Sequence, residues 1–129
     1  MLKKILVVDD DDICRDLLAE ILEVQYEIIH AKNGYEALSL LSFQLGKVAA
    51  VLLDLMMPQM NGYEFLEQFN ERGWNKKCPV IVVSSSDDEE TLDKCRQLGV
   101  NFFIEKPYTF KEASYVIESA IENFKKKKK

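Results

Sequence analysis

Five short runs of β-forming residues alternate with longer helical segments along the chain, and this alternation constrains the fold more than any other feature. The predicted strands cover residues 4–8, 26–31, 49–54, 79–84 and 101–105. Three of them are almost continuously apolar, as expected of parallel strands covered by helices on both faces. Five strand–helix pairs in strict order therefore predict an α/β domain with a parallel sheet and right-handed crossovers.

The segments between the strands carry helical periodicity and capping signals. Apolar residues recur at helical spacing in two of them: Ile13, Leu17, Leu18, Ile21 and Leu22, and then Ala37, Leu38, Leu41 and Leu45. Four predicted helix starts place glutamate three positions after a capping residue: Asn33/Glu36, Asn61/Glu64, Ser86/Glu89 and Thr109/Glu112. Gly99 follows a helical stretch, where a left-handed C-cap favours glycine.

Composition indicates one globular domain, because 47% of the 129 residues are hydrophobic and 30% are charged. No apolar run approaches the ~20 residues that span a membrane, and no signal-peptide pattern is present, so we expect a cytoplasmic protein. The net charge is −5 although residues 125–129 are all lysine. The acidic body argues against nucleic acid binding by this domain. We expect the domain to cover residues 1–124 and the lysine-rich tail, 125–129, to be disordered.

The three cysteines, Cys14, Cys78 and Cys95, are odd in number and show no CxxC spacing. This pattern favours reduced, partly buried thiols over a metal site or a catalytic role.

Charged and hydroxyl residues stand where four of the five predicted strands end. Asp9 and Asp10 follow the first strand, Asp54 ends the third, Ser84 ends the fourth and Lys106 follows the fifth. Asp54 is the only acid within AVLLDLMMPQMNG, residues 50–62, and burying an unpaired charge costs several kcal/mol. Since ligands of such sheets bind beyond the carboxyl ends of the strands, we expect these side chains to share one polar pocket.

Three neighbouring carboxylates would repel one another, at about 4 kcal/mol for each pair ~4 Å apart in an effective dielectric near 20. Mg²⁺ is the natural counter-ion, because it accepts oxygen ligands and shares phosphate oxygens. Together with a lysine and a hydroxyl, this site suits phosphoryl transfer to Asp54, giving an aspartyl phosphate. Taken singly, these residues have ordinary alternatives: Asp9 to Asp12, and Asp11 and Asp12 above all, as caps of the first helix, Ser84 as a strand-end hydroxyl and Lys106 as a surface charge.

These motifs resemble the receiver domain of two-component response regulators, and the length is similar to that of single-domain chemotaxis regulators. The resemblance covers residues 2–124 and rests on ILVVDD (5–10), LLDLMMPQMNG (52–62), PVIVVSSS (79–86) and IEKPY (104–108). It implies a flavodoxin-like (βα)5 doubly wound parallel five-stranded sheet of order 2-1-3-4-5. It also implies a phosphorylation-dependent signalling switch, which assists its own phosphotransfer and dephosphorylation but is not a conventional turnover enzyme.

Residue by residue, the resemblance makes Asp54 the phosphoacceptor. It assigns Mg²⁺ binding to Asp10 directly, to Asp9 largely through water, to Asp54 and to the backbone carbonyl of Met56. Ser84 and Lys106 would contact the phosphoryl group, and the Lys106–Pro107 peptide bond is expected to be cis.

The resemblance also implies how the signal leaves the pocket. Ser84 would move toward the phosphoryl group and Phe103 would turn inward, which changes the surface formed by the fourth helix, fifth strand and fifth helix. The alternative for Phe103 is a plain core aromatic. Phe103 lacks the hydroxyl of a switch tyrosine, Ser85 stands where a small apolar residue is common, and Met56 and Ser86 occupy positions that tune dephosphorylation.

The implied partners are a histidine kinase or phosphotransfer protein and either a downstream protein target or an output domain absent from this chain. Membrane and direct nucleic acid binding are not expected, and a phosphorylation-dependent homodimer is left open.

Two other classes of protein compete with the signalling switch. A phosphohydrolase with an aspartyl nucleophile would often place a second acid two residues later, where this chain has Met56. An FMN-binding protein would need a glycine- and hydroxyl-rich loop after the first strand, where this chain has DDDD.

Overall fold

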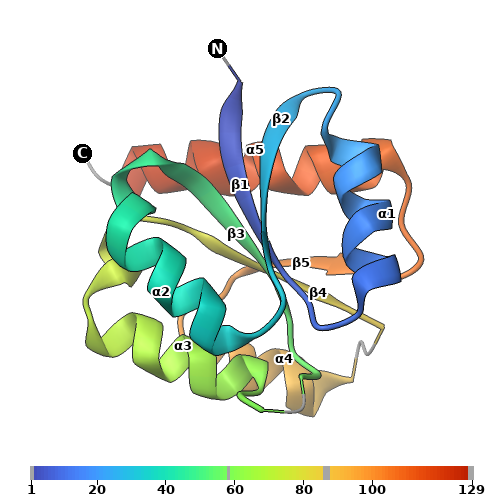
Figure 1. Cartoon of the computed structure of the whole chain (residues 1–129). Coiled ribbons are helices and arrows are strands. Elements are labelled where there is room, and N and C mark those ends of the chain that lie inside the picture. The colour runs from blue at the N-terminus through green and yellow to red at the C-terminus, as the bar shows by residue number, and fades with distance from the viewer. Residues whose placement is uncertain (1, 58, 86–87, 128–129) are drawn as a thin grey trace.

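The protein is described by a computed structural model that covers residues 2–57, 59–85 and 88–127. Strands and helices alternate along the chain (Figure 1). The strands are β1 (Lys3–Val8), β2 (Tyr26–Ala31), β3 (Val48–Asp54), β4 (Val80–Ser84) and β5 (Phe102–Glu105). The α-helices are α1 (Asp12–Leu22), α2 (Gly34–Gln44), α3 (Gly62–Glu71), α4 (Glu89–Gln97) and α5 (Phe110–Lys127). Two short 3-10 helices, η1 (Leu45–Lys47) and η2 (Trp74–Lys76), precede β3 and β4.

The five strands form one parallel sheet in the order β2-β1-β3-β4-β5, which confirms the predicted fold. Because all strands run the same way, their carboxyl ends meet at a single edge. The strand order reverses between β1 and β3, so the ends of these two strands flank the crevice in which such sheets bind ligands. The register places Asp54 opposite Val83, and Ser84 opposite Glu105.

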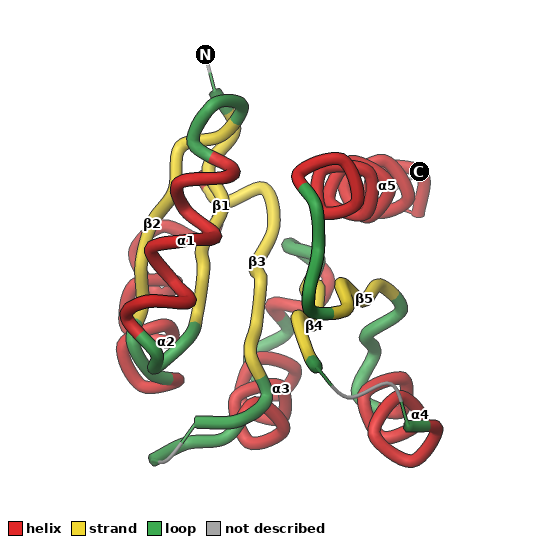
Figure 2. The backbone as a smooth tube through the Cα atoms, turned by 90° about the vertical axis from the view of Figure 1, so that its right-hand side faces the viewer, coloured by secondary structure: helices red, strands yellow, loops and turns green. Residues whose placement is uncertain are grey.

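Helices cover both faces of the sheet (Figures 1 and 2). Each face has its own apolar core. On one face α1 and α5 pack against alternate strand residues such as Ile5, Leu52 and Ile81. On the other face α2, α3 and α4 pack against the intervening residues, among them Leu6 and Leu53. Burial on both faces explains why the central strands are almost continuously apolar.

Three of the four predicted helix caps are confirmed. The side-chain oxygens of Asn33, Asn61 and Thr109 accept hydrogen bonds from the backbone N–H three residues later. The start of α4 differs from the prediction: its N-cap is Asp88, whose carboxylate accepts from the Thr91 N–H at 2.8 Å. Glu89 is therefore the first residue of the helix, and Ser86 lies outside the described residues.

Other predictions about helices were only partly right. The apolar stripe of α1 is wider than its buried face, since Ile13 is 81% and Leu17 53% exposed. Helix α5 continues to Lys127, so part of the predicted disordered tail is helical.

Gly99 adopts the left-handed backbone conformation (φ 91°) after α4, as predicted. Within the described ranges, every helix is too short or too polar to cross a lipid bilayer.

Candidate functional site

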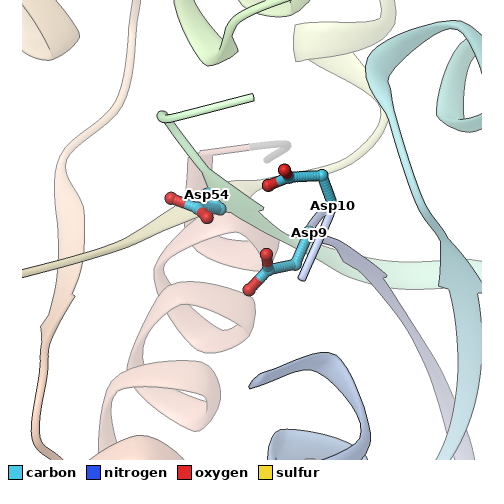
Figure 3. A group of neighbouring side chains, drawn as sticks. All are labelled: Asp9, Asp10 and Asp54. Atoms are coloured by element: carbon cyan, nitrogen blue, oxygen red, sulfur yellow. The ribbon is translucent and has the colours of Figure 1, made fainter. Parts of the chain in front are cut away.

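Three carboxylates converge at the carboxyl edge of the sheet (Figure 3). Asp9 and Asp10 follow β1, and Asp54 is the last residue of β3. One carboxylate oxygen from each lies within 4.8 Å of those of the other two. Asp9 is buried, Asp54 is half-buried and Asp10 is exposed, so solvent reaches one side of the group.

Backbone N–H groups and one arginine hold the acids in place. The Asp9 carboxylate accepts from the Asp11 N–H at 2.9 Å, and that of Asp54 accepts from the Met56 N–H at 3.2 Å. The Asp11 carboxylate caps α1 instead, which is the alternative role that the sequence predicted for it. Arg15, which the sequence analysis missed, donates from Nη1 to the Asp9 carbonyl at 2.7 Å. A basic residue one turn into a helix that follows an acidic cluster was its only sequence signal.

The surroundings of Asp54 disfavour the negative charge of its carboxylate. Burial, and then the charge of Asp9, raise the pKa of Asp54 to about 6, although the Met56 N–H and the Lys106 ammonium act in the opposite direction. The side chains therefore fit a hard divalent cation, which would relieve the mutual repulsion and accept their oxygens as ligands.

Lys106 reaches the same pocket from the end of β5. It lines a cavity of about 190 Å³ together with Asp9, Asp54 and Cys14. It forms no ion pair within the part of the chain that is described. Its charge acts against the rise in the pKa of Asp54 and adds to the lowering of the Asp11 pKa, which is caused first by the hydrogen bond from the Cys14 N–H. Its peptide bond to Pro107 is cis, as predicted, and its N–H donates to the Ser84 carbonyl at 2.9 Å.

The remaining predicted residues surround the pocket less closely. Ser84 ends β4 at the same edge, next to the register partner of Asp54, and is half-buried. Met56 is 80% exposed and contacts Asp54 through its backbone N–H. Phe103, on β5, packs half-buried against the core on the α2–α4 face, and the Arg96 guanidinium carbon lies 5.8 Å from its ring centroid.

A glycine closes the loop that follows Asp54. The N–H of Gly62 donates to the Leu55 carbonyl at 2.9 Å, which brings the start of α3 back to the end of β3. A Cβ at position 62 would lie 2.7 Å from the Leu55 Cα, so only glycine fits this approach.

The fold and the pocket together define a flavodoxin-like α/β domain with an acidic cluster and a lysine at the carboxyl edge of its sheet. The sequence profile of the response regulator receiver domain matches residues 5–118. The chain therefore belongs to the receiver domain family of two-component response regulators.

Several characterised proteins share this domain. The chain is 33% identical over 120 residues to the cyclic di-GMP phosphodiesterase of Thermotoga maritima, covering 92% of this chain but 31% of that protein. It is 37% identical over 106 residues to response regulator RR06 of Streptococcus pneumoniae, covering 81% of this chain and 46% of that protein. The two-component response regulator ORR11 of Oryza sativa is 33% identical over 104 residues, which cover 80% and 70% of the two chains. The chain thus spans less than half of both bacterial relatives.

Solved structures confirm the fold. A response regulator receiver domain protein from Clostridium thermocellum superposes with a TM-score of 0.86 at 25% identity, covering 96% of this chain and 98% of that one. The chemotaxis protein CheY4 of Vibrio cholerae superposes with a TM-score of 0.84 at 22% identity, covering 93% and 99%.

Proposed function

We propose that the protein is a phosphorylation-dependent switch that accepts a phosphoryl group on Asp54 from a histidine kinase or a phosphotransfer protein. Family membership implies phosphorylation-dependent signalling. The observation that supports the choice of residue is the convergence of Asp9, Asp10 and Asp54, with Lys106 lining a cavity that Asp9 and Asp54 also line. Asp54 alone of the three acids is held at the end of a central strand with its carboxylate half-buried.

In the proposed reaction, a carboxylate oxygen of Asp54 attacks the phosphorus of the donor. The bond from phosphorus to the donor histidine nitrogen breaks, and the imidazole leaves with the bonding electron pair. A bound Mg²⁺, held by Asp9, Asp10, Asp54 and the Met56 carbonyl, would supply charge neutralisation for the phosphoryl oxygens. The ammonium of Lys106 and the hydroxyl of Ser84 hold those oxygens once the new bond has formed.

Ser84 and Phe103 are the proposed route from the pocket to a partner. Movement of Ser84 toward the phosphoryl group would free space beside β5, and Phe103 would turn into that space. The ring of Phe103 would then leave the Arg96 guanidinium, whose carbon is 5.8 Å from the ring centroid. The surface of α4, β5 and α5 would change as a result, and a target protein or output domain would bind it.

The relatives suggest what kind of output such a domain controls. One of them is named a cyclic di-GMP phosphodiesterase, and this chain matches 31% of its length. The part that does not match would contain the phosphodiesterase. We therefore propose that this domain itself is not a conventional enzyme and that it regulates a separate domain or protein.

Acetyl phosphate and intact-mass spectrometry test the proposal. In the presence of Mg²⁺ the wild-type chain should gain one phosphoryl group, and Asp54→Asn should gain none. Asp12→Asn is the matched control, because Asp12 lies in the same acidic run but pairs with Arg15 outside the pocket. An adduct of undiminished yield in Asp54→Asn would refute Asp54 as the acceptor.

A further inference from the structure

Lysines gather at the amino edge of the sheet, opposite the acidic pocket. They come from the start of β1, from the segments η1 and η2 to residue 77 that precede β3 and β4, and from the end of α5: Lys3, Lys4, Lys47, Lys76, Lys77, Lys125 and Lys126. Lys3 pairs with Glu118 at 3.7 Å and Lys4 with Glu27 at 3.5 Å. Among residues whose side chains are described, no carboxylate lies within ion-pair distance of Lys76, Lys77 or Lys125.

A cavity of about 410 Å³ opens at this same edge. Helices α3 and α5, the start of β4 and the connection from α4 to β5 form its walls. Its deepest lining side chains are apolar and almost fully buried: Leu66, Phe69, Cys78, Val100 and Ala120. Burial raises the pKa of Cys78 to about 12, so this thiol is neutral and part of the apolar wall at physiological pH.

Polar groups are confined to the mouth of the cavity. Lys76 and the amide side chains of Asn75, Asn101 and Asn123 line it there. An adjoining hollow shares Pro79 and Phe124 with the cavity and is lined by three lysines, Lys3, Lys77 and Lys125. The cavity is also braced, because Asn70 of α3 donates to the Leu98 carbonyl at the end of α4 at 2.8 Å. An apolar space thus opens directly beside a cluster of ammonium groups.

We propose that this edge binds a single-chain anionic amphiphile of the fatty-acid class. The alkyl chain would enter the cavity at the amino ends of β4 and β5, which is lined by α3 from one face of the sheet and by α5 from the other. The carboxylate would lie at the mouth among Lys76, Lys77 and Lys125. The volume falls within the ~300–1,000 Å³ of small-molecule sites, and a carboxylate complements ammonium groups that have no carboxylate partner among the described side chains. A nucleic acid would match the lysines but would leave the apolar cavity unfilled.

The single tryptophan provides a direct readout, because Trp74 lies beside this cavity. Its ring centroid is 6.0 Å from that of Phe69, which lines the cavity. Titration of the unphosphorylated protein with octanoate should change Trp74 fluorescence and shift the amide resonances of Val80, Val100 and Phe102. Affinity should rise about fourfold for each methylene from hexanoate to decanoate until the cavity is filled.

The role of the lysines is tested by changing the head group and the protein charge separately. 1-Octanol, which has the same chain without the charge, should bind about tenfold more weakly than octanoate. Lys76→Glu combined with Lys77→Glu should weaken octanoate about tenfold or more. Lys32→Glu combined with Lys111→Glu carries the same net charge on residues outside both hollows and should bind as the wild type does.

Filling the cavity tests the site of the alkyl chain. Ala120→Leu places three extra carbons in the cavity and should abolish binding of hexanoate, octanoate and decanoate. Asn123→Phe does the same from the half-buried rim and serves if the core substitution prevents folding, which circular dichroism reports.

Several results would overturn the proposal. These are absence of any octanoate response at Trp74, equal affinity for octanol, equal weakening in both double variants, or unchanged binding in Asn123→Phe. Binding to vesicles of anionic phospholipid without binding of monomeric octanoate would assign the lysines to a membrane surface instead. Displacement of bound octanoate by a DNA oligonucleotide would assign them to nucleic acid. None of these measurements involves Asp54, so they stand apart from the test of phosphorylation.

Discussion

At the scale of single residues, the pocket brings together three acids whose charges repel one another. Asp54 has a raised pKa because it is half-buried and faces Asp9. The residue types and their positions at the strand ends were sufficient to predict this meeting of acids. Arg15 was not predicted, because its role depends on a backbone carbonyl, that of Asp9, which every residue has and which no sequence pattern distinguishes.

Asp54→Asn should stabilise the metal-free protein. It removes one of three repelling carboxylates and keeps the shape of the side chain. We expect a gain of about 1–2 kcal/mol in the free energy of unfolding at neutral pH with EDTA present, because partial exposure screens much of the repulsion. Urea unfolding measures it, and added Mg²⁺ should reduce the difference by stabilising the wild type. A variant less stable than the wild type in EDTA would show that the three acids do not repel appreciably.

Arg15→Ala should weaken both the fold and the cation site. The substitution removes the hydrogen bond to the Asp9 carbonyl and the ion pair with Asp12, which should lower the free energy of unfolding by about 1–3 kcal/mol. Because the loop bearing Asp9 and Asp10 is then less constrained, the rise in melting temperature on adding Mg²⁺ should also be smaller. Asp12→Asn is the control, because it removes the ion pair and keeps the bond from Arg15 to the Asp9 carbonyl. An equal response to Mg²⁺ in wild type and Arg15→Ala would limit the arginine to a structural role.

At the scale of elements, the strands could be predicted to within one residue, because three of them are nearly continuous apolar runs that are bounded by polar residues and too short to form buried helices. Helix α1 was harder. Its apolar stripe includes Ile13 and Leu17, but α1 lies near the end of the sheet, and only Leu18, Ala19 and Leu22 are buried on it. The start of α4 was misplaced because serine and aspartate cap helices equally well, and local sequence did not decide between them.

Helix α5 is joined to β1 and β2 by polar contacts between residues that are far apart in the sequence. The Tyr26 hydroxyl donates to Glu118, and Lys3 pairs with the same carboxylate. Tyr26→Phe should lower the free energy of unfolding by about 1–3 kcal/mol at neutral pH. Burial, followed by the bond to Glu118, raises the pKa of Tyr26 to about 12, so the unfolded chain loses this proton first, near pH 10. Wild-type stability should therefore fall between pH 10 and about 12, and more steeply than that of Tyr26→Phe.

Parallel pH titrations of chemical unfolding, monitored by far-ultraviolet circular dichroism, measure these slopes. Tyr115→Phe is the matched control, because Tyr115 is 74% exposed on α5. Identical slopes in Tyr26→Phe and the wild type would mean that Tyr26 titrates alike in the folded and unfolded states.

At the scale of the whole molecule, the parallel sheet separates charge between its two edges. Acids from the ends of β1 and β3 meet at one edge, and lysines from the start of β1 and from the segments that precede β3 and β4 lie at the other. The acidic edge could be predicted because topology rules say where such sheets bind ligands. The lysine edge could not, since its members are scattered along the sequence and its cavity is lined by residues that resemble ordinary core.

Activation should change one side of this molecule and leave the lysine edge unaltered. Beryllofluoride with Mg²⁺ imitates a phosphoryl group on Asp54, and its binding should draw Ser84 toward the pocket. Phe103 should then leave the Arg96 guanidinium, so amide resonances should shift at the pocket and across α4, β5 and the adjoining face of α5. Those of Lys3, Lys47 and Lys77 should stay within experimental error.

Two variants serve as controls. Asp54→Asn should show none of these shifts, and Phe103→Ala should retain the pocket shifts while losing most of those in α4. Shifts that stop at the pocket in the wild type would mean that phosphorylation is read at the acidic edge itself, without the α4–β5–α5 surface.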